Sequence, residues 1–295
     1  MSRPQNHPAQ QFAAPSSIQR GMPLNELMDR KLISLIGQSL VNVMPDFDIR
    51  QFQDRAVRGL HKLELKQRAS QIAQAMAEQL PADFDDVLPL LIRSLGPPLR
   101  TTEGNGLAVF FYLPHSHLIA EQGVRRFQSG MVANYEVTQR FTAEFSVRPF
   151  LSEHRTKCLK LLSRWTKDPN PHVRRLVSEG TRPRLPWADR LPEFQQDPHL
   201  ALPLLESLKD DPELYVRRSV ANHLGDIAKD HLLVVFDVCE RWLKEAKDLD
   251  DAMSAENRRW MIRHALRHPA KNESAQAVRL RKLASPQNRR KSRAE

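Results

Sequence analysis

The chain has 295 residues, a formal net charge of +10 at pH 7 and only 10 glycines. It contains no apolar run near the roughly 20 residues that a membrane span needs, and no basic segment followed by an apolar one that would mark a signal peptide. Its two cysteines, Cys158 and Cys239, lie far apart within apolar helical patterns, which indicates buried thiols rather than a disulfide or a metal site. We therefore expect a cytoplasmic protein without membrane association, metal or other cofactor.

The positive charge is concentrated in two parts of the chain. Residues 258–295 hold 12 Lys and Arg against two acids, whereas the rest of the chain has 33 residues of each sign. Within that balanced part, residues 140–190 hold 12 basic and 5 acidic residues. Because each phosphate that Lys or Arg neutralises releases counterions, this distribution favours a polyanion as partner. The alternative is a solvated surface with a disordered basic tail, which is our interpretation of residues 286–295.

The N-terminal third is predicted to consist of a leader followed by helices. Residues 1–20 are rich in Pro, Gln, Ser and Ala and show no period, which predicts a disordered leader. From 21 to 100 the apolar residues recur at three- and four-residue steps, which predicts an N-terminal helical part. Residues 107–113 (LAVFFYL) form a short apolar run that fits a strand or a buried helix.

Helix pairs recur at a regular spacing over residues 131–285. Val173-Arg174-Arg175 returns as Val216-Arg217-Arg218 after 43 residues, and Ile262-Arg263-His264 follows after a further 46. These spacings fall within the roughly 40–47 residues of HEAT and armadillo units. The pattern predicts an all-α fold: a right-handed solenoid of HEAT-like helical repeats, in a single domain over residues 21–285, with a concave face.

An arginine at the same helical position in successive repeats would form a basic stripe along that face. The phosphates of a duplex could bind to such a stripe, which makes the concave face a candidate DNA-binding surface. The alternative is that these arginines connect neighbouring repeats by pairing with Asp168 and Asp211, and we expect this role for some of them.

Three acids stand out because of their basic or apolar helical context. They are Glu144 in RFTAEFSVRPF, Glu179 in RRLVSEGTRPR and Asp226 in VANHLGDIAKD. All three come at the C-terminal ends of predicted repeat helices, so one face could gather them. A carboxylate opposes DNA binding unless it stabilises cationic charge that grows in a transition state. The alternative is that each acid pairs with a nearby arginine. We favour a function for Glu179, which lies between two arginine pairs in a turn rich in Gly and Pro.

Two further features have a structural alternative beside a functional one. Trp187 ends the loop segment RPRLPW, where an aromatic side chain could stack on nucleotides or anchor the loop in the core. His115 and His117 suggest a metal pair only faintly. Without a carboxylate or cysteine at matching spacing, packing is the better interpretation for both histidines.

Several long segments together carry a family resemblance. RFTAEFSVRPFL, RWTKDPNPHVRRLVSEGTRPRLPWA, LLESLKDDPELYVRRSVANHLGDIAKDH and RRWMIRHALR resemble the AlkC branch of the DNA alkylation-repair proteins, which are HEAT-like-repeat DNA glycosylases. The resemblance spans roughly residues 22–284. It implies a monofunctional glycosylase that excises cationic N-alkylated bases, 3-methyladenine first and 3-methylcytosine as a further substrate, without fully flipping the base. Such a base leaves without protonation, so carboxylates would stabilise the oxocarbenium-like sugar and position a water.

The resemblance also implies roles for individual residues. Glu179 and Asp226 would stabilise the charge and position the water, and Glu144 would contact the lesion or support them. Trp187 would pack against the sugar or backbone of the lesion. Six basic residues would hold phosphates: Arg148, Arg175, Arg182, Arg184, Arg218 and Lys229. The implied partner is double-stranded DNA with alkylated bases, bound by a monomer in the bacterial cytosol. The alternative is a non-catalytic HEAT-like module that binds DNA or protein.

Overall fold

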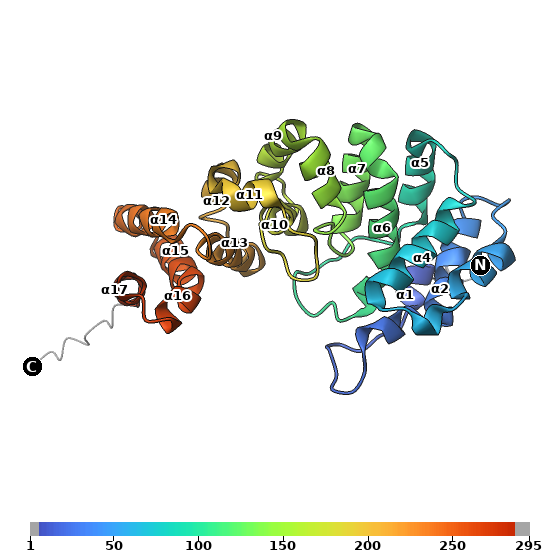
Figure 1. Ribbon diagram of the computed structural model, residues 1–295, viewed down its shortest axis with the longest axis horizontal. Helices are drawn as coiled ribbons and strands as arrows, with labels where there is room; N and C mark the ends of the chain where they lie inside the picture. The colour runs from blue at the N-terminus through green and yellow to red at the C-terminus, as the bar shows by residue number, and fades with distance from the viewer. Residues whose placement is uncertain (1–5, 287–295) are drawn as a thin grey trace, which may run out of the picture. The chain divides into compact units, whose positions relative to one another are not determined.

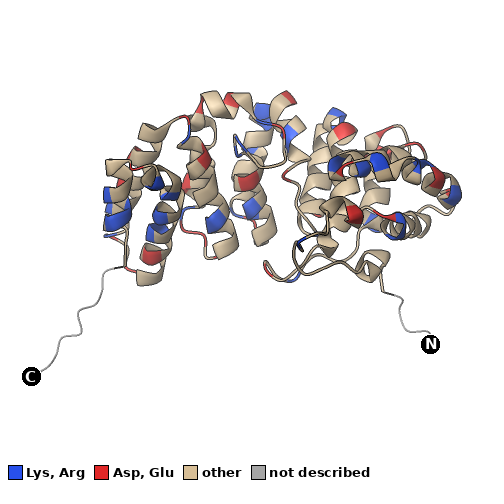
Figure 2. Ribbon diagram, turned by 60° about the horizontal axis from the view of Figure 1, so that its bottom comes forward, with Lys and Arg blue, Asp and Glu red and all other residues tan. Residues whose placement is uncertain are grey.

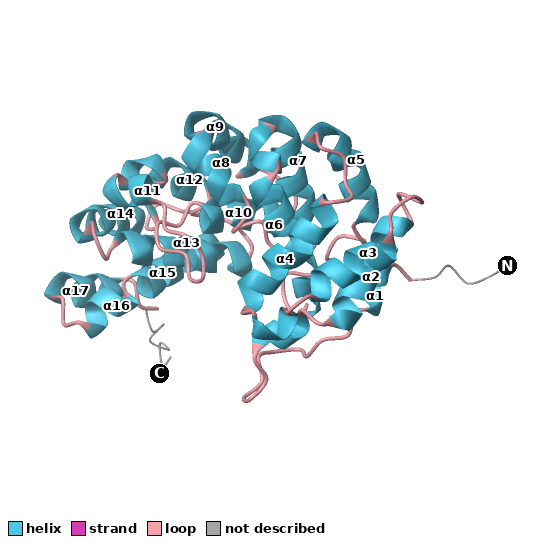
Figure 3. Ribbon diagram, turned by 45° about the vertical axis from the view of Figure 1, so that its right-hand side comes forward, coloured by secondary structure: helices cyan, strands magenta, loops and turns pink. Residues whose placement is uncertain are grey.

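Helices and their connecting loops make up the part of the chain that the structure describes. The computed structural model describes residues 6–286 and contains α-helices and 3-10 helices but no strand within that range (Figure 3). The prediction of an all-α fold is therefore confirmed. Among the described residues, none of the helices has the length and apolarity to cross a membrane. The chain divides into two compact units between Leu161 and Leu162, inside α9 (Arg155–Trp165), where the sequence predicts one domain.

The first unit is built from helices that pack on their neighbours in the chain (Figure 1). Its α-helices are α1 (Pro8–Gln11), α2 (Arg30–Val41), α3 (Ile49–Val57), α4 (Leu65–Ala77), α5 (Phe84–Ser94), α6 (Leu113–Glu121), α7 (Phe127–Thr138) and α8 (Val147–Glu153). Its 3-10 helices are η1 (Leu24–Leu27), η2 (Leu60–Lys62), η3 (Ala108–Tyr112) and η4 (Gly123–Arg125). Asp29, Asp48 and Asp83 each cap a helix by accepting a hydrogen bond from a backbone N–H of its first turn.

The segment before α2 corrects the prediction of a disordered leader. Residues 8–11 form α1, and the side chain of Phe12 is only 6% exposed because its ring packs 6.2 Å from that of Phe111. The backbone N–H of Leu107 also donates to the carbonyl of Pro15 at 2.9 Å. A single buried aromatic produces no periodic pattern, so this contact could not be predicted from the sequence. Residues 1–5, and residues 287–295 of the predicted basic tail, lie outside the described residues.

The ambiguous apolar run at 107–113 is helical. It forms η3 and enters α6, with Pro114 in the first turn of that helix, where its missing N–H costs no hydrogen bond. Phe111 is fully buried. The strand alternative is therefore wrong.

The second unit carries the predicted repeats. Its α-helices are α10 (Pro171–Gly180), α11 (Pro192–Gln196), α12 (Leu202–Ser207), α13 (Leu214–Ile227), α14 (Leu232–Glu245), α15 (Ala252–Ala265), α16 (Arg267–Lys271) and α17 (Ala275–Leu283), with the 3-10 helix η5 (Pro198–Leu200). Helix α13 packs against both α10 and α15. Val173 and Val216 are each the third residue of their helix, whereas Ile262 is the eleventh residue of α15, so the predicted third repeat does not keep the register of the first two. All three residues are 0% exposed. The repeat spacing in the sequence thus marks helices that stack in the structure.

The first arginine of two repeats fastens the loop that precedes its helix, whereas Arg263 in the third bonds to the carbonyl of Ala284 and to Glu256. Nη1 of Arg174 donates to the carbonyl of Asp168 at 2.9 Å, and Nη1 of Arg217, 43 residues later, donates to that of Asp211 at 2.8 Å. Arg174 also donates from Nε to the Asp211 carboxylate at 2.6 Å. Arg174 therefore connects neighbouring repeats, as the structural alternative to a phosphate stripe predicts, whereas Arg217 bonds to the loop of its own repeat.

Candidate active site

Glu179 lies in a part of α10 where its negative charge is unfavourable unless cations are nearby. Helix α10 runs from Pro171 to Gly180 and is capped by Asn170, whose side chain accepts a hydrogen bond from the N–H of His172 at 2.9 Å. Glu179 is therefore in the last turn, at the negative end of the helix dipole, which disfavours an anion. Only 6% of the residue is exposed.

Three side chains compensate this charge. Arg182 donates from Nη1 to Oε1 of Glu179 at 2.6 Å, and the Ser219 hydroxyl donates to Oε2 at 2.6 Å. Nη2 of Arg175 lies 3.5 Å from Oε1, and the guanidinium of this arginine sits over the ring of Tyr215, 5.2 Å from its centroid. Ser219 and Tyr215 belong to α13, so Glu179 also links α10 to the next stacked helix.

Asp226 is the second acid of this cluster. It lies in the last turn of α13 and is 4% exposed. Arg182 donates from Nε to Oδ2 of Asp226 at 2.8 Å, and Lys229 donates to Oδ1 at 2.9 Å. One guanidinium thus bridges Glu179 and Asp226, which we call the carboxylate pair.

Electrostatics keep Glu179 ionised. Burial raises the pKa of Glu179, but the charges of Arg175 and Arg182 and the hydrogen bond from Ser219 outweigh burial and hold the pKa below its ordinary value. Burial conversely lowers the pKa of Arg182, and the two carboxylates more than compensate, so its pKa lies above the ordinary value. Glu179 is therefore an anion at neutral pH, held among cations.

Two residues that the sequence reasoning missed complete the cluster from α13. His223 is fully buried, and its Nδ1 lies 2.9 Å from the carbonyl of Ser178. Burial lowers the pKa of His223 to about 4, so the ring is neutral at pH 7 and Nδ1–H donates to that carbonyl. The other is Ser219. Ser219, His223 and Asp226 follow at four- and three-residue steps, the spacing of one helix face, and this signal could have identified both residues.

Trp187 stands at the tip of the loop that follows α10. It is 62% exposed, which excludes the core-anchor alternative in this structure, and its backbone φ is +62°, a left-handed conformation that is rare for a bulky residue. Arg184 clamps the same loop with two hydrogen bonds to Asp230, at 2.9 Å from Nε and 2.7 Å from Nη2. The ion pair of Arg184 and Asp230 thus holds the loop, and the side chain of Trp187 is presented to solvent.

The other predicted site residues are placed as follows. Glu144 and Arg148 belong to the first unit, and Glu144 lies in the turn before α8, not at the C-terminal end of a helix as predicted. Glu144 is 9% exposed and accepts a hydrogen bond from the Thr142 hydroxyl at 2.8 Å, and Arg148, in α8, is 4% exposed. Arg218 is exposed on α13. Burial of Arg148 and Arg182 does not fit the surface contacts with phosphate that the sequence predicts for them.

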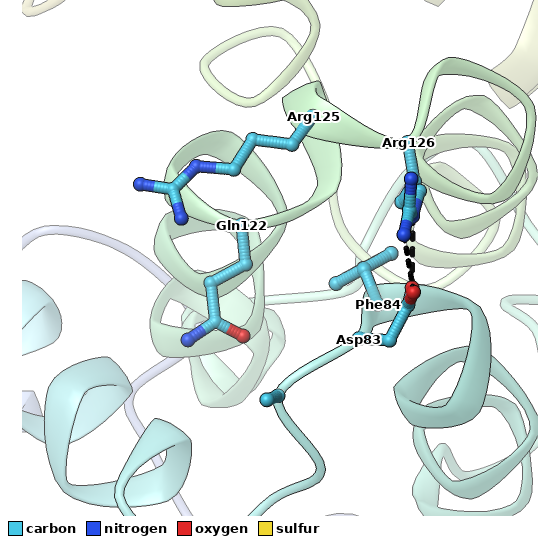
Figure 4. Close-up of a pocket in the computed structure, with 6 residues that line it drawn as sticks. Asp83, Phe84, Gln122, Arg125 and Arg126 are labelled. Atoms are coloured by element: carbon cyan, nitrogen blue, oxygen red, sulfur yellow. Dashed lines mark hydrogen bonds and ion pairs between the residues drawn. The ribbon is translucent and has the colours of Figure 1, made fainter.

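The first unit also has a hollow, which none of the predicted site residues lines. Its wall includes Asp83, Phe84, Gln122, Arg125 and Arg126 (Figure 4). Arg126 donates from Nε to Asp83 at 2.9 Å, and this hydrogen bond lowers the pKa of Asp83 to about 2. Residues 6–286 contain no cluster of three or more side chains suited to hold a metal ion.

Comparisons with known proteins identify the family of the chain. Residues 132–268 match the family described as DNA alkylation repair enzyme. The uncharacterized protein YhaZ of Bacillus subtilis (strain 168) is 34% identical over 258 residues, which are 87% of this chain and 67% of YhaZ. The structure of Pseudomonas fluorescens alkylpurine DNA glycosylase AlkC, bound to DNA containing an abasic site analog, matches with a TM-score of 0.76 and 35% identity, over 91% of this chain and 68% of AlkC. The chain therefore belongs to the AlkC-type family of DNA alkylation repair enzymes.

Proposed function

We propose that the protein is a monofunctional DNA glycosylase that excises cationic N-alkylated bases from duplex DNA, with 3-methyladenine as its main substrate and 3-methylcytosine as a further one. The observation that carries this proposal is the carboxylate pair, in which Arg182 bridges two largely buried acids in the same unit as the exposed Trp187. The similarity to an alkylpurine DNA glycosylase solved with DNA supports both the activity and the partner.

The chemistry of the leaving group explains why a pair of carboxylates could promote base release without a general acid. An N-alkylated base already carries a positive charge, so it departs without a general acid, and the remaining barrier is the oxocarbenium character of the deoxyribose. A carboxylate about 4 Å from that charge contributes about 4 kcal/mol at an effective dielectric constant near 20, less what the neighbouring cations cancel. Every oxygen of Glu179 and Asp226 accepts a hydrogen bond within the protein, and Oδ2 of Asp226 lies close to both Nε and Nη2 of Arg182. A carboxylate oxygen has two lone pairs, so Oδ1 of Asp226, which accepts from Lys229, could also orient the attacking water.

The surrounding groups divide into those that bind DNA and one that positions the acids. Trp187 would pack against the sugar or backbone at the lesion. Exposed or partly exposed cations would hold phosphates: Arg175, Arg184, Arg218 and Lys229. Glu144 stays a proposed contact with the lesion. We assign Arg182 to positioning the carboxylate pair rather than to phosphate binding, because its guanidinium bonds to both acids.

The proposal includes a lesion that remains largely within the duplex, a part that rests on the AlkC-type resemblance alone. A fluorescent 2-aminopurine placed next to a non-hydrolysable lesion analogue would test it. If the lesion stays stacked, enzyme binding leaves the fluorescence low, whereas full flipping unstacks the neighbour and raises it. A large increase would contradict this part of the proposal without affecting the assignment of the activity.

Base release from duplexes that contain 3-methyladenine, 3-methylcytosine or 7-methylguanine tests the function directly. The wild-type protein should release the first base fastest. Glu179→Gln or Asp226→Asn should lower the single-turnover rate by at least about 10²-fold, the typical loss when one electrostatic group is removed. DNA affinity and fold should be nearly unchanged in both variants.

Asp211→Asn is the matched control. This substitution weakens another buried ion pair in the same unit, that of Arg174 and Asp211, outside the carboxylate pair. It should lower stability but leave the single-turnover rate within a few fold of the wild type. Wild-type rates in Glu179→Gln and Asp226→Asn would refute the mechanism. Salt-sensitive DNA binding without release of any base would instead indicate a non-catalytic DNA-binding module.

A further inference from the structure

A hollow of about 330 Å³ at the C-terminal end of the second unit is lined by cations and by no acid. It lies among α15, α16 and α17, where Lys and Arg gather (Figure 2). The basic residues of its wall are Arg263, Lys271, Arg281 and Lys282. Four cations around one small space repel each other, so the arrangement favours an anionic occupant.

Among the residues that the structure describes, one of the four cations has an acidic partner. Arg263 pairs with Glu256 at 2.7 Å and donates to the carbonyl of Ala284. Lys271, Arg281 and Lys282 have no ion-pair partner among residues 6–286. Nε of Arg281 is moreover buried without a hydrogen-bond acceptor. A buried donor without an acceptor is costly, and an oxygen atom of a ligand in the hollow would satisfy it.

Basic residues lie near one another between this hollow and the carboxylate pair. Lys229, which bonds to Asp226, lies within electrostatic range of His268, and His268 is likewise close to Lys271 at the end of α16. Helix α16 has five residues, so it is about 7 Å long. Phosphates of one DNA strand follow each other at about 3.4 Å along the axis. A strand with its lesion at the carboxylate pair could therefore place a phosphate in the hollow within a few nucleotides.

We propose that the hollow binds a phosphodiester group of the DNA strand that flanks the lesion, with Lys271, Arg281 and Lys282 as its ligands. This site rests on the proposed function, because it takes the partner to be DNA. The guanidinium of Arg281 would donate from Nε and from its terminal nitrogens to the phosphate oxygens, a geometry that a single lysine cannot provide. The two lysines would add charge on either side.

The salt dependence of binding to unmodified duplex tests the site. The double variant Arg281→Gln/Lys282→Gln should weaken binding about tenfold near 0.1 M salt, and should reduce the slope of log K against log salt by about one. The control is Arg279→Gln. Arg279 lies on the same helix but pairs with Glu240, so its substitution should change neither the affinity nor the slope appreciably. An unchanged slope in the double variant would overturn the proposal.

A methylphosphonate scan identifies the source of the phosphate. Replacing one flanking phosphodiester at a time by the neutral analogue should locate a position that weakens binding by the wild-type protein and has no further effect on the double variant. If no position behaves in this way while inorganic phosphate binds to the wild type alone, the hollow takes a free phosphate and the proposal is wrong.

These measurements are made in the Glu179→Gln background, so they do not depend on base excision. In an otherwise wild-type chain, the double variant should need about tenfold more enzyme to reach the half-maximal single-turnover rate of 3-methyladenine release, in line with its weaker DNA binding. If the wild-type protein releases no base but the salt slope and the scan behave as expected, the proposed function fails and the phosphodiester site remains.

Discussion

Arg182 and Asp226 lie 44 residues apart in the sequence, yet Nε of Arg182 donates to Oδ2 of Asp226 at 2.8 Å. This separation is close to the 43-residue repeat of Val173 and Val216, and the bond therefore crosses from one repeat to the next. The same guanidinium bonds to Glu179. The distance between the two acids thus depends on one arginine and on the stacking of α10 on α13.

Arg182→Lys should lower the single-turnover rate of base release by about 10²-fold, because an ammonium group cannot bond to both acids in the planar geometry of a guanidinium. The slope of DNA binding against salt should stay at the wild-type value if Arg182 does not contact a phosphate. Arg174→Lys is the control, since it weakens a comparable two-point pair with Asp211. A reduced salt slope together with a wild-type rate of base release would mean that Arg182 binds a phosphate and does not position the two acids.

The repeat pattern predicted the stacked helices better than the roles of the arginines. A period of 43 residues identifies stacked helices because Val173 and Val216 must be buried at equivalent positions. An arginine at such a position has two physical uses, a loop clamp or a surface contact, and both give the same sequence pattern. Asp168 and Asp211, which follow the same period, were the signal for the clamp.

Two other features had no sequence pattern strong enough to predict them. Phe12 is an isolated aromatic in a polar segment, and its burial depends on a partner 99 residues later, Phe111. The division inside α9 likewise follows from long-range packing and not from a linker composition. Contacts of this kind depend on the tertiary structure, which local propensity does not encode.

Phe12→Ala should destabilise the protein by about 3 kcal/mol or more, as is typical when a buried phenylalanine is truncated. The free energy of unfolding, measured with a chemical denaturant, checks this expectation. Ile18→Ala is the control in the same segment. Ile18 is 63% exposed, so its truncation should change the stability by less than about 0.5 kcal/mol. Equal stability of both variants would mean that Phe12 is not buried in solution, as expected for a disordered leader.

Trp187→Ala and Trp187→Gly should separate the function of this side chain from the strain of its backbone. Both variants should bind DNA more weakly by about 1–3 kcal/mol, the usual effect of removing a stacked aromatic. Glycine adopts a φ of +62° readily and alanine does not, so Trp187→Gly should be more stable than Trp187→Ala by about 1 kcal/mol. Thermal unfolding of the two variants checks the order. Equal melting temperatures would mean that the loop relaxes when the tryptophan is absent.

His223 should make the protein less stable in acid. Burial lowers the pKa of His223 from 6.5 to about 4, so between these values the unfolded chain binds a proton that the folded chain does not. Stability falls wherever the unfolded state binds more protons and the pH decreases. The contribution is complete above pH 6.5 and should diminish by about 1 kcal/mol per pH unit as the pH falls toward 4.

His223→Gln isolates this contribution, since glutamine can donate to the Ser178 carbonyl but does not titrate. Other histidines with lowered pKa values supply the rest of the acid sensitivity: His115, at about 3, and His117 and His264, each at about 4. The variant should therefore retain a slope of unfolding free energy against pH, but a smaller one than the wild type, with the difference confined to pH 4–6.5. Identical slopes would show that His223 has the same pKa in the folded and the unfolded state, and a difference that persists above pH 7 would trace it to lost packing instead of titration.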